Sequence, residues 1–175
     1  MVKAVKAVFL DRDGVIVRGK IIKKKLYAPK SLKSFFFYPK VVENLFFLKT
    51  LGFKLFIITN QPDLANNKIS LETLNQMNEI LKKKLPISQI YMCTHSQKAN
   101  CICRKPKTYL IKKAAKDNHI HLNKSYLIGD RWSDIKAGND AGCKTIFIDR
   151  KYNENYPTEQ IKTVYSLSGA VKYIL

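Results

Sequence analysis

The sequence predicts an α/β fold, in which a central parallel sheet is covered by helices on both faces in a three-layer, Rossmann-like arrangement. Short apolar runs of strand length alternate along the chain with amphipathic segments of helix length, a pattern typical of doubly wound parallel sheets. Polar clusters follow several of the expected strands, at the positions where ligands bind in such sheets. At 175 residues the chain has the size of one domain, expected to span 1–175.

Each element is indicated by its own residues. The apolar run AVKAVFL predicts the first strand, and Gly52 is a natural end for the first helix. Ser70 is expected to cap the second helix, because a serine hydroxyl accepts from free backbone N–H groups in a first helical turn. The expected strands are residues 4–10, 53–58, 88–92, 125–128 and 144–148, and the expected helices are 39–51, 71–84, 107–118, 133–141 and 164–175.

The segment 18–40 does not fit this alternation. It carries seven lysines and the aromatic run Phe35-Phe36-Phe37-Tyr38. We interpret it as a long loop or flap near the site, with its aromatic side chains tucked against the core. Long loops are often functional, but a surface excursion without catalytic meaning explains the same residues equally well.

The composition limits the classes of protein to which this chain can belong. No apolar stretch has the length of a membrane span, and no secretion signal precedes the first strand, so we expect a cytoplasmic protein. The net charge of +19 suits anionic partners such as phosphorylated sugars or nucleic acid. However, the 27 lysines far outnumber the five arginines. This ratio favours a solvated surface over a dedicated phosphate-reading face, where arginine is preferred.

Two carboxylates follow the first strand, in FLDRDG. In an extended segment Asp11 and Asp13 would face one site together, while Arg12 would point away. One carboxylate can attack phosphorus to form an aspartyl-phosphate. The other can protonate the leaving oxygen and then activate water.

A second acidic cluster, GDRWSD, follows the strand at 125–128. Asp130 and Asp134, together with Asp11, can supply the oxygen ligands that Mg²⁺ prefers. The metal would offset the repulsion between an anionic nucleophile and an anionic substrate. At other strand ends, Thr59 and Asn60 can donate to a phosphate oxygen, and Lys105 can place a positive charge beside it.

These residues resemble the haloacid dehalogenase (HAD) superfamily along essentially the whole chain. FLDRDGVI, ITNQ, the lysine of RKP and IGDRWSDI match its four motifs in order. The resemblance implies a HAD fold with Asp11 as nucleophile, Asp13 as general acid and base, and a magnesium site that includes the backbone carbonyl of Asp13. It implies these catalytic residues: Asp11, Asp13, Thr59, Asn60 and Lys105. It implies these magnesium ligands: Asp11, Asp13, Asp130 and Asp134. The implied substrate-binding residues are Arg104, Asn60, Gln61 and Arg131.

The segment CTHSQKANCICRKP contains Cys93, His95, Cys101 and Cys103, a set typical of structural zinc sites. A disulfide or a group of buried thiols are the alternatives, but a chain without a secretion signal favours zinc. The loop resembles that of the heptose 1,7-bisphosphate phosphatases and the related histidinol-phosphate phosphatases. There the zinc is structural and shapes a loop that leads into the positions of Arg104 and Lys105.

We therefore expect a magnesium-dependent phosphatase of a small phosphorylated metabolite, with D-glycero-D-manno-heptose 1,7-bisphosphate as substrate and its 7-phosphate as the group released. Histidinol phosphate is the second candidate, and a polynucleotide 3'-phosphatase is a third. The second motif departs from the heptose enzymes, since Pro62-Asp63 replaces their Ser-Gly and Asn66-Asn67 their Arg-Gly. A further alternative is a non-enzymatic module that is organised by zinc and binds nucleic acid. In such a protein Asp11, Asp13, Lys105 and Asp130 would have no role, so we place this alternative last. We expect a monomer, with no membrane or nucleic-acid partner.

Overall fold

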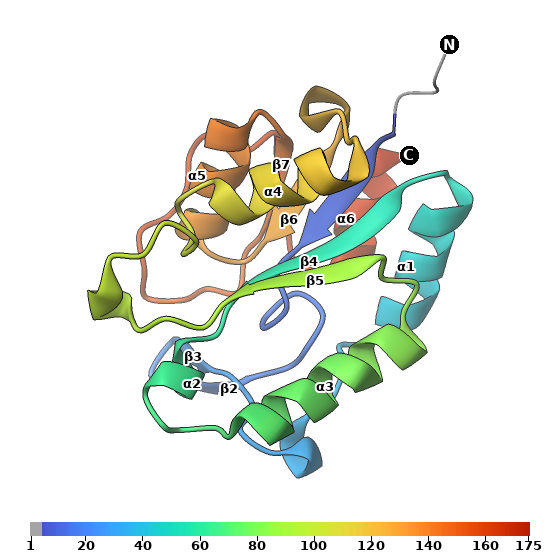
Figure 1. Ribbon diagram of the computed structural model, residues 1–175. Coiled ribbons are helices and arrows are strands. Elements are labelled where there is room, and N and C mark those ends of the chain that lie inside the picture. Colours follow the sequence, from blue (N-terminus) through green and yellow to red (C-terminus); the bar gives the residue numbers. More distant parts are fainter. Residues whose placement is uncertain (1–4) are drawn as a thin grey trace.

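A computed structural model describes residues 5–175, and its core is a parallel sheet of six strands (Figure 1). The strand order is β5-β4-β1-β6-β7-β8, and every neighbouring pair is parallel. The strands are β1 (Ala7–Leu10), β4 (Lys54–Asn60), β5 (Gln89–Cys93), β6 (Tyr126–Gly129), β7 (Lys144–Ile148) and β8 (Lys162–Val164). The predicted α/β fold is thus confirmed; residue 4 of the first expected strand lies outside the described residues.

Helices cover both faces of the sheet. Three helices, α1 (Val41–Thr50), α3 (Leu71–Lys84) and α6 (Leu167–Ile174), share one apolar cluster, and α4 (Tyr109–Asn118) and α5 (Trp132–Ala141) share another (Figure 1). The strands contribute side chains to both clusters, because successive side chains of a strand point to opposite faces of the sheet. In β1, Val8 and Leu10 join the first cluster, and Ala7 and Phe9 join the second.

The helix boundaries follow local signals. The hydroxyl oxygen of Ser70 accepts a hydrogen bond from the Thr73 N–H at 3.1 Å, which confirms the predicted cap of α3. Gly52 follows α1 with a φ of +82°, the left-handed conformation in which many helices end. No helix in the described part of the chain is long and apolar enough to cross a membrane.

The segment 18–40 is more ordered than a simple loop. It contains a hairpin of β2 (Lys20–Ile22) and β3 (Lys25–Tyr27). The hairpin turn places Lys23 and Lys24 at φ values of +48° and +57°, although such turns usually use asparagine or glycine there. The hairpin could not be recognised in the sequence, because its turn contains two lysines and all three residues of β2 are exposed. The prediction that the aromatic side chains pack against the core is only partly confirmed, since Phe35 is buried but Phe36 is 59% exposed.

The C-terminal part of the prediction was wrong in one respect. Residue 164 does not begin a helix, because Lys162–Val164 form β8 at the edge of the sheet and α6 begins at Leu167, capped by Ser166. A strand of three residues is too short to show a period in the sequence. The other short elements are α2 (Pro62–Ala65) and the 3₁₀ turns η1 (Leu32–Ser34), η2 (Gln97–Ala99) and η3 (Leu122–Lys124).

Candidate active site and metal centres

A cleft of about 630 Å³ lies beyond the carboxyl ends of the strands, within the size range of metabolite sites. Strand β1 lies at the switch point of the sheet, since the chain continues to β4 on one side and reaches β6 on the other. The Asp11 N–H donates to the carbonyl of Ile128 at 3.0 Å, which holds the end of β1 against the end of β6. The topology thus brings the first and fourth motifs together at one edge.

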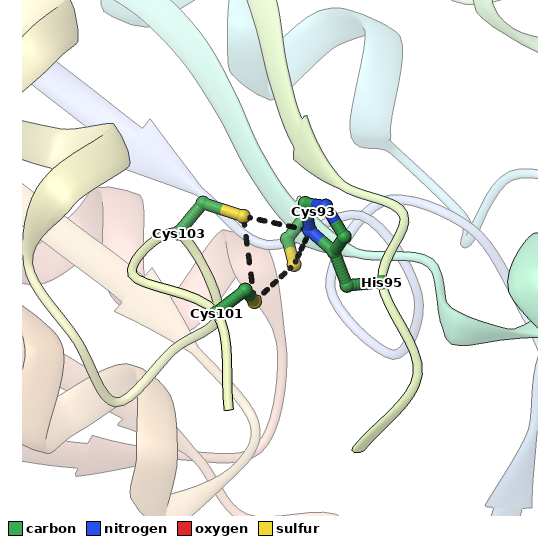
Figure 2. A group of neighbouring side chains, drawn as sticks. All are labelled: Cys93, His95, Cys101 and Cys103. Carbon is green, nitrogen blue, oxygen red and sulfur yellow. Dashed lines mark hydrogen bonds between the residues drawn. The ribbon is translucent and has the colours of Figure 1, made fainter. Parts of the chain in front are cut away.

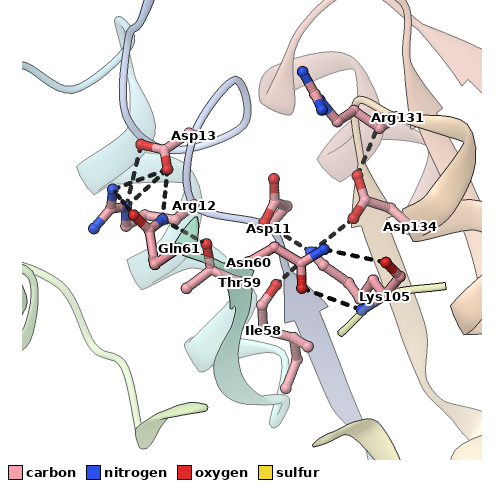
Figure 3. A network of polar contacts seen from close by, with 10 residues as sticks. All are labelled: Asp11, Arg12, Asp13, Ile58, Thr59, Asn60, Gln61, Lys105, Arg131 and Asp134. Carbon is pink, nitrogen blue, oxygen red and sulfur yellow. Dashed lines mark hydrogen bonds and ion pairs between the residues drawn. The ribbon is translucent and has the colours of Figure 1, made fainter. Parts of the chain in front are cut away.

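The ammonium group of Lys105 lies between the carboxylates of Asp11 and Asp134 (Figure 3). Its Nζ is 2.8 Å from Oδ1 of Asp11 and 2.7 Å from Oδ1 of Asp134, and all three side chains are buried. Burial alone would lower the pKa of this ammonium group, but the two carboxylates outweigh it and raise the pKa above its usual value. Lys105 therefore stays charged and balances part of the negative charge of the cluster.

Asp130 completes the acidic group. Ligand oxygens of Asp11, Asp130 and Asp134 all lie within 4.8 Å of one another. Burial raises the pKa of Asp130 and of Asp134, and the charge of Asp11 raises both further. Oδ1 of Asp130 is buried and has no hydrogen-bond partner among the described residues. Lys105 carries one positive charge and pairs with two of the three buried carboxylates, so negative charge remains to be balanced and the donor set fits a Mg²⁺ ion.

Asp13 lies outside this group of three carboxylates, and the position of Arg12 beside it corrects one expectation. Arg12 does not point away from it: Nη2 of Arg12 lies 2.9 Å from Oδ2 of Asp13 in a buried ion pair. Gln61 donates from Nε2 to the same oxygen at 2.7 Å (Figure 3). The alternation of side chains fails here because β1 ends at Leu10 and the chain bends before Asp13. Asp11 and Asp13 nevertheless both line the cleft.

Thr59 and Asn60 end β4 and have different surroundings. Thr59 is buried, and its hydroxyl accepts a hydrogen bond from Nε2 of Gln61 at 2.9 Å. Asn60 lines the cleft and bonds the backbone of Lys105. Both side chains thus brace catalytic candidates, Thr59 through the glutamine that holds Asp13 and Asn60 through Lys105.

The four residues predicted to bind substrate all line the cleft: Arg104, Asn60, Gln61 and Arg131. Nη1 of Arg104 is buried without a hydrogen-bond partner in the described chain, which leaves a cationic donor available to an anion. The hairpin also contributes Lys25 and Tyr27 to the cleft lining, two residues that the sequence did not single out. The expectation that segment 18–40 lies near the site is confirmed.

Cys93, His95, Cys101 and Cys103 converge on one point (Figure 2). Sγ of Cys101 lies 3.4 Å from Sγ of Cys93 and 3.6 Å from Sγ of Cys103, and Nδ1 of His95 lies 3.2 Å from Sγ of Cys103. These separations are too long for a disulfide. They approach the roughly 3.7 Å expected between sulfur ligands around a tetrahedral zinc ion. Burial raises the pKa of the Cys93 thiol, so a cation is needed to hold it as thiolate.

The chain is similar in sequence to known proteins. Residues 102–163 match the family model described as HAD-hydrolase-like. The D-glycero-beta-D-manno-heptose-1,7-bisphosphate 7-phosphatase of Helicobacter pylori strain J99 is 40% identical over 152 residues, covering 82% of this chain and 83% of that protein. The histidine biosynthesis bifunctional protein HisB of Blochmanniella floridana is 34% identical over 146 residues, covering 81% of this chain and 40% of that protein.

The fold has a close match among solved structures. The D,D-heptose 1,7-bisphosphate phosphatase of B. bronchiseptica, solved with magnesium and phosphate, superposes with a TM-score of 0.85 at 23% identity, covering 97% of this chain and 98% of that one. In this chain, residues of all four motifs line the cleft. With a relative 40% identical over four fifths of both proteins, the chain belongs to the HAD family of phosphatases.

Proposed function

We propose that the chain is a magnesium-dependent phosphomonoesterase that removes the 7-phosphate of D-glycero-β-D-manno-heptose 1,7-bisphosphate through an aspartyl-phosphate on Asp11. The contact that carries the proposal is the one between Lys105 and the carboxylates of Asp11 and Asp134. It holds a nucleophile and a cation together at the floor of a metabolite-sized cleft. The substrate is proposed from the name of the Helicobacter pylori relative.

The covalent half-reaction uses Asp11 and Asp13. The Asp11 carboxylate attacks phosphorus as the bond from phosphorus to the sugar oxygen breaks, and that oxygen takes the proton that Asp13 carries in the substrate complex. Arg104, whose buried Nη1 atom has no hydrogen-bond partner among the described residues, is placed to contact the phosphoryl oxygens, and the nearby positive charge of Lys105 stabilises them. Asp11, Asp130, Asp134 and the Asp13 backbone carbonyl would hold Mg²⁺, whose positive charge would offset the repulsion between nucleophile and phosphate.

The second half-reaction restores the enzyme. Asp13, now a carboxylate, takes a proton from water, and the oxygen of that water attacks phosphorus. The bond between phosphorus and Asp11 breaks, which releases inorganic phosphate and returns Asp11 as a carboxylate while Asp13 regains its proton. Gln61 and Arg12 hold Asp13 at the cleft for both proton transfers.

We propose a structural role for zinc in the four-residue cluster. Arg104 and Lys105 follow Cys103 directly in the chain. An ion that fixes Cys101 and Cys103 thereby fixes the backbone from which both cationic side chains extend. Zinc is assigned no step in the reaction.

Histidinol phosphate is the second candidate substrate, because the HisB relative matches 81% of this chain. A panel tests the choice: both heptose 1,7-bisphosphate anomers, histidinol phosphate and a 3'-phosphorylated oligonucleotide, each assayed for Mg²⁺-dependent phosphate release. We expect the β anomer to have the highest kcat/KM and the Asp11→Asn variant to be inactive. A higher kcat/KM for histidinol phosphate would replace the substrate but keep the mechanism. Equal turnover by Asp11→Asn would overturn the mechanism itself.

A further inference from the structure

The two carboxylate oxygens of Asp130 have different surroundings. Oδ2 accepts a hydrogen bond from the hydroxyl of Tyr152 at 2.7 Å. Oδ1 is buried and has no hydrogen-bond partner among the residues that the structure describes. A carboxylate with one oxygen occupied by a fixed donor has a set orientation, and its other oxygen remains available to a cation.

The Tyr152 hydroxyl and Oδ2 of Asp130 pack directly against the backbone of Gly14. A Cβ atom added to Gly14 would lie 1.8 Å from Oδ2 of Asp130 and 3.0 Å from the Tyr152 hydroxyl oxygen. Only the absence of a side chain at this position leaves room for the pair. The first motif therefore forms one wall of the site in which the tyrosine meets the aspartate.

Neighbouring contacts hold the tyrosine in place. The guanidinium of Arg131 lies 5.9 Å from the centre of the Tyr152 ring, and its Nη2 atom forms an ion pair with Glu154 at 3.0 Å. Nε of Arg150 donates to the carbonyl of Gly14 at 2.9 Å. The segment 150–154 is thus attached to the first motif at one end and to the fourth motif at the other.

From this geometry we propose that Tyr152 is a positioning residue for the divalent cation: its hydroxyl fixes Oδ2 of Asp130 and thereby presents Oδ1 to the metal. The proposal rests on the proposed function only in taking Asp130 as a magnesium ligand. Groups that orient a metal ligand in this way affect metal affinity without touching the ion. Tyr152 therefore contributes to Mg²⁺ binding and takes no part in the proton transfers.

The test compares Tyr152→Phe with Tyr156→Phe. Tyr156 belongs to the same loop, is 56% exposed, and its hydroxyl makes no hydrogen bond to the described residues. Mg²⁺ affinity is measured by calorimetric titration of metal-free protein, and kcat is measured at saturating Mg²⁺. We expect Tyr152→Phe to bind Mg²⁺ about 10- to 100-fold more weakly, with kcat largely restored at saturation. Tyr156→Phe should match the wild type in both measurements.

A third variant separates the hydroxyl from the loop. Glu154→Gln removes the charge that pairs with Arg131 but keeps the hydrogen bond from Tyr152 to Asp130, so its Mg²⁺ affinity should stay near that of the wild type. Unchanged Mg²⁺ affinity in Tyr152→Phe would overturn the proposal, as would an equal loss in Glu154→Gln. Because the calorimetric readout needs no turnover, a wrong substrate assignment leaves this test intact. Circular dichroism of metal-free Tyr152→Phe confirms that the variant is folded, which the unchanged ring is expected to ensure.

Discussion

Asn60 holds Lys105 through both polar groups of its backbone. The Asn60 Nδ2 atom donates to the Lys105 carbonyl at 3.2 Å, and the Asn60 Oδ1 atom accepts from the Lys105 N–H at 3.1 Å. An asparagine at the end of β4 thereby fixes a lysine from a distant loop, whose Nζ reaches the carbonyl of Ile58 on the same strand. The amide thereby orients the cation.

Asn60→Ala should therefore act mainly on turnover. We expect kcat to fall roughly 10- to 100-fold, because a small displacement of Lys105 misaligns the nucleophile. Stability should fall by about 1–2 kcal/mol for the two lost hydrogen bonds. Steady-state kinetics and urea unfolding measure both effects, with Asn75→Ala on the exposed side of α3 as the matched control. A rise in KM with unchanged kcat would show that Asn60 binds substrate directly.

The buried pair of Arg12 and Asp13 predicts a strong dependence of stability on both partners. Arg12→Met should destabilise the protein by about 3–5 kcal/mol, because it leaves the buried Asp13 carboxylate without its cation. The double variant Arg12→Met with Asp13→Asn should recover much of this loss while remaining inactive. Denaturant unfolding of the two single variants and the double variant measures the coupling. Additive losses in the double variant would contradict the ion pair.

Zinc removal should disturb catalysis through Arg104 and Lys105. Cys101→Ser is expected to reduce the zinc content from about one ion per chain and to lower both the melting temperature and kcat. Cys143 provides the control, since it is a buried cysteine that is not one of the four grouped residues. Elemental analysis of Cys143→Ala should show undiminished zinc. Full activity of a zinc-free Cys101→Ser protein would refute the structural role.

Stability of the metal-free protein should fall as pH rises. The folded-state pKa values of Asp130 and Asp134 lie above the ordinary value of 3.8 because of burial and neighbouring carboxylates. The folded protein therefore binds more protons than the unfolded chain in the interval above that value, and its free energy of unfolding decreases with pH there. Mg²⁺ compensates for the ionised carboxylates, so the rise in melting temperature on adding Mg²⁺ should be larger at about pH 8 than at about pH 5. An equal rise at both values would count against this cluster as the metal site.

The sequence predicted the strand-end residues well because parallel strands have a simple geometry. Asp11 and Asp130 directly follow β1 and β6, whose apolar runs are unambiguous, and their positions at the carboxyl ends of these strands bring them together. The convergence of Cys93, His95, Cys101 and Cys103 was predictable for a different reason, since all four belong to one short loop.

Contacts made by residues outside regular helices and strands could not be predicted from the sequence. The contact between Arg12 and Asp13 could not be predicted from alternation, because β1 ends before both residues. The hairpin of segment 18–40 has lysines where turn residues are expected. Tyr152 lies in an irregular segment, and its hydrogen bond to Asp130 spans 22 positions without a local pattern to indicate it.

The central claim is a covalent phosphoryl group on Asp11, and trapping that intermediate tests it most directly. The protein is mixed with Mg²⁺ and heptose 1,7-bisphosphate, quenched during turnover and treated with borohydride, which reduces an aspartyl-phosphate to homoserine. Peptide mass spectrometry should find this reduction at position 11, and it should be absent without substrate and in Asp11→Asn. Reduction at another carboxylate, or rapid phosphate release with position 11 unmodified, would contradict the account.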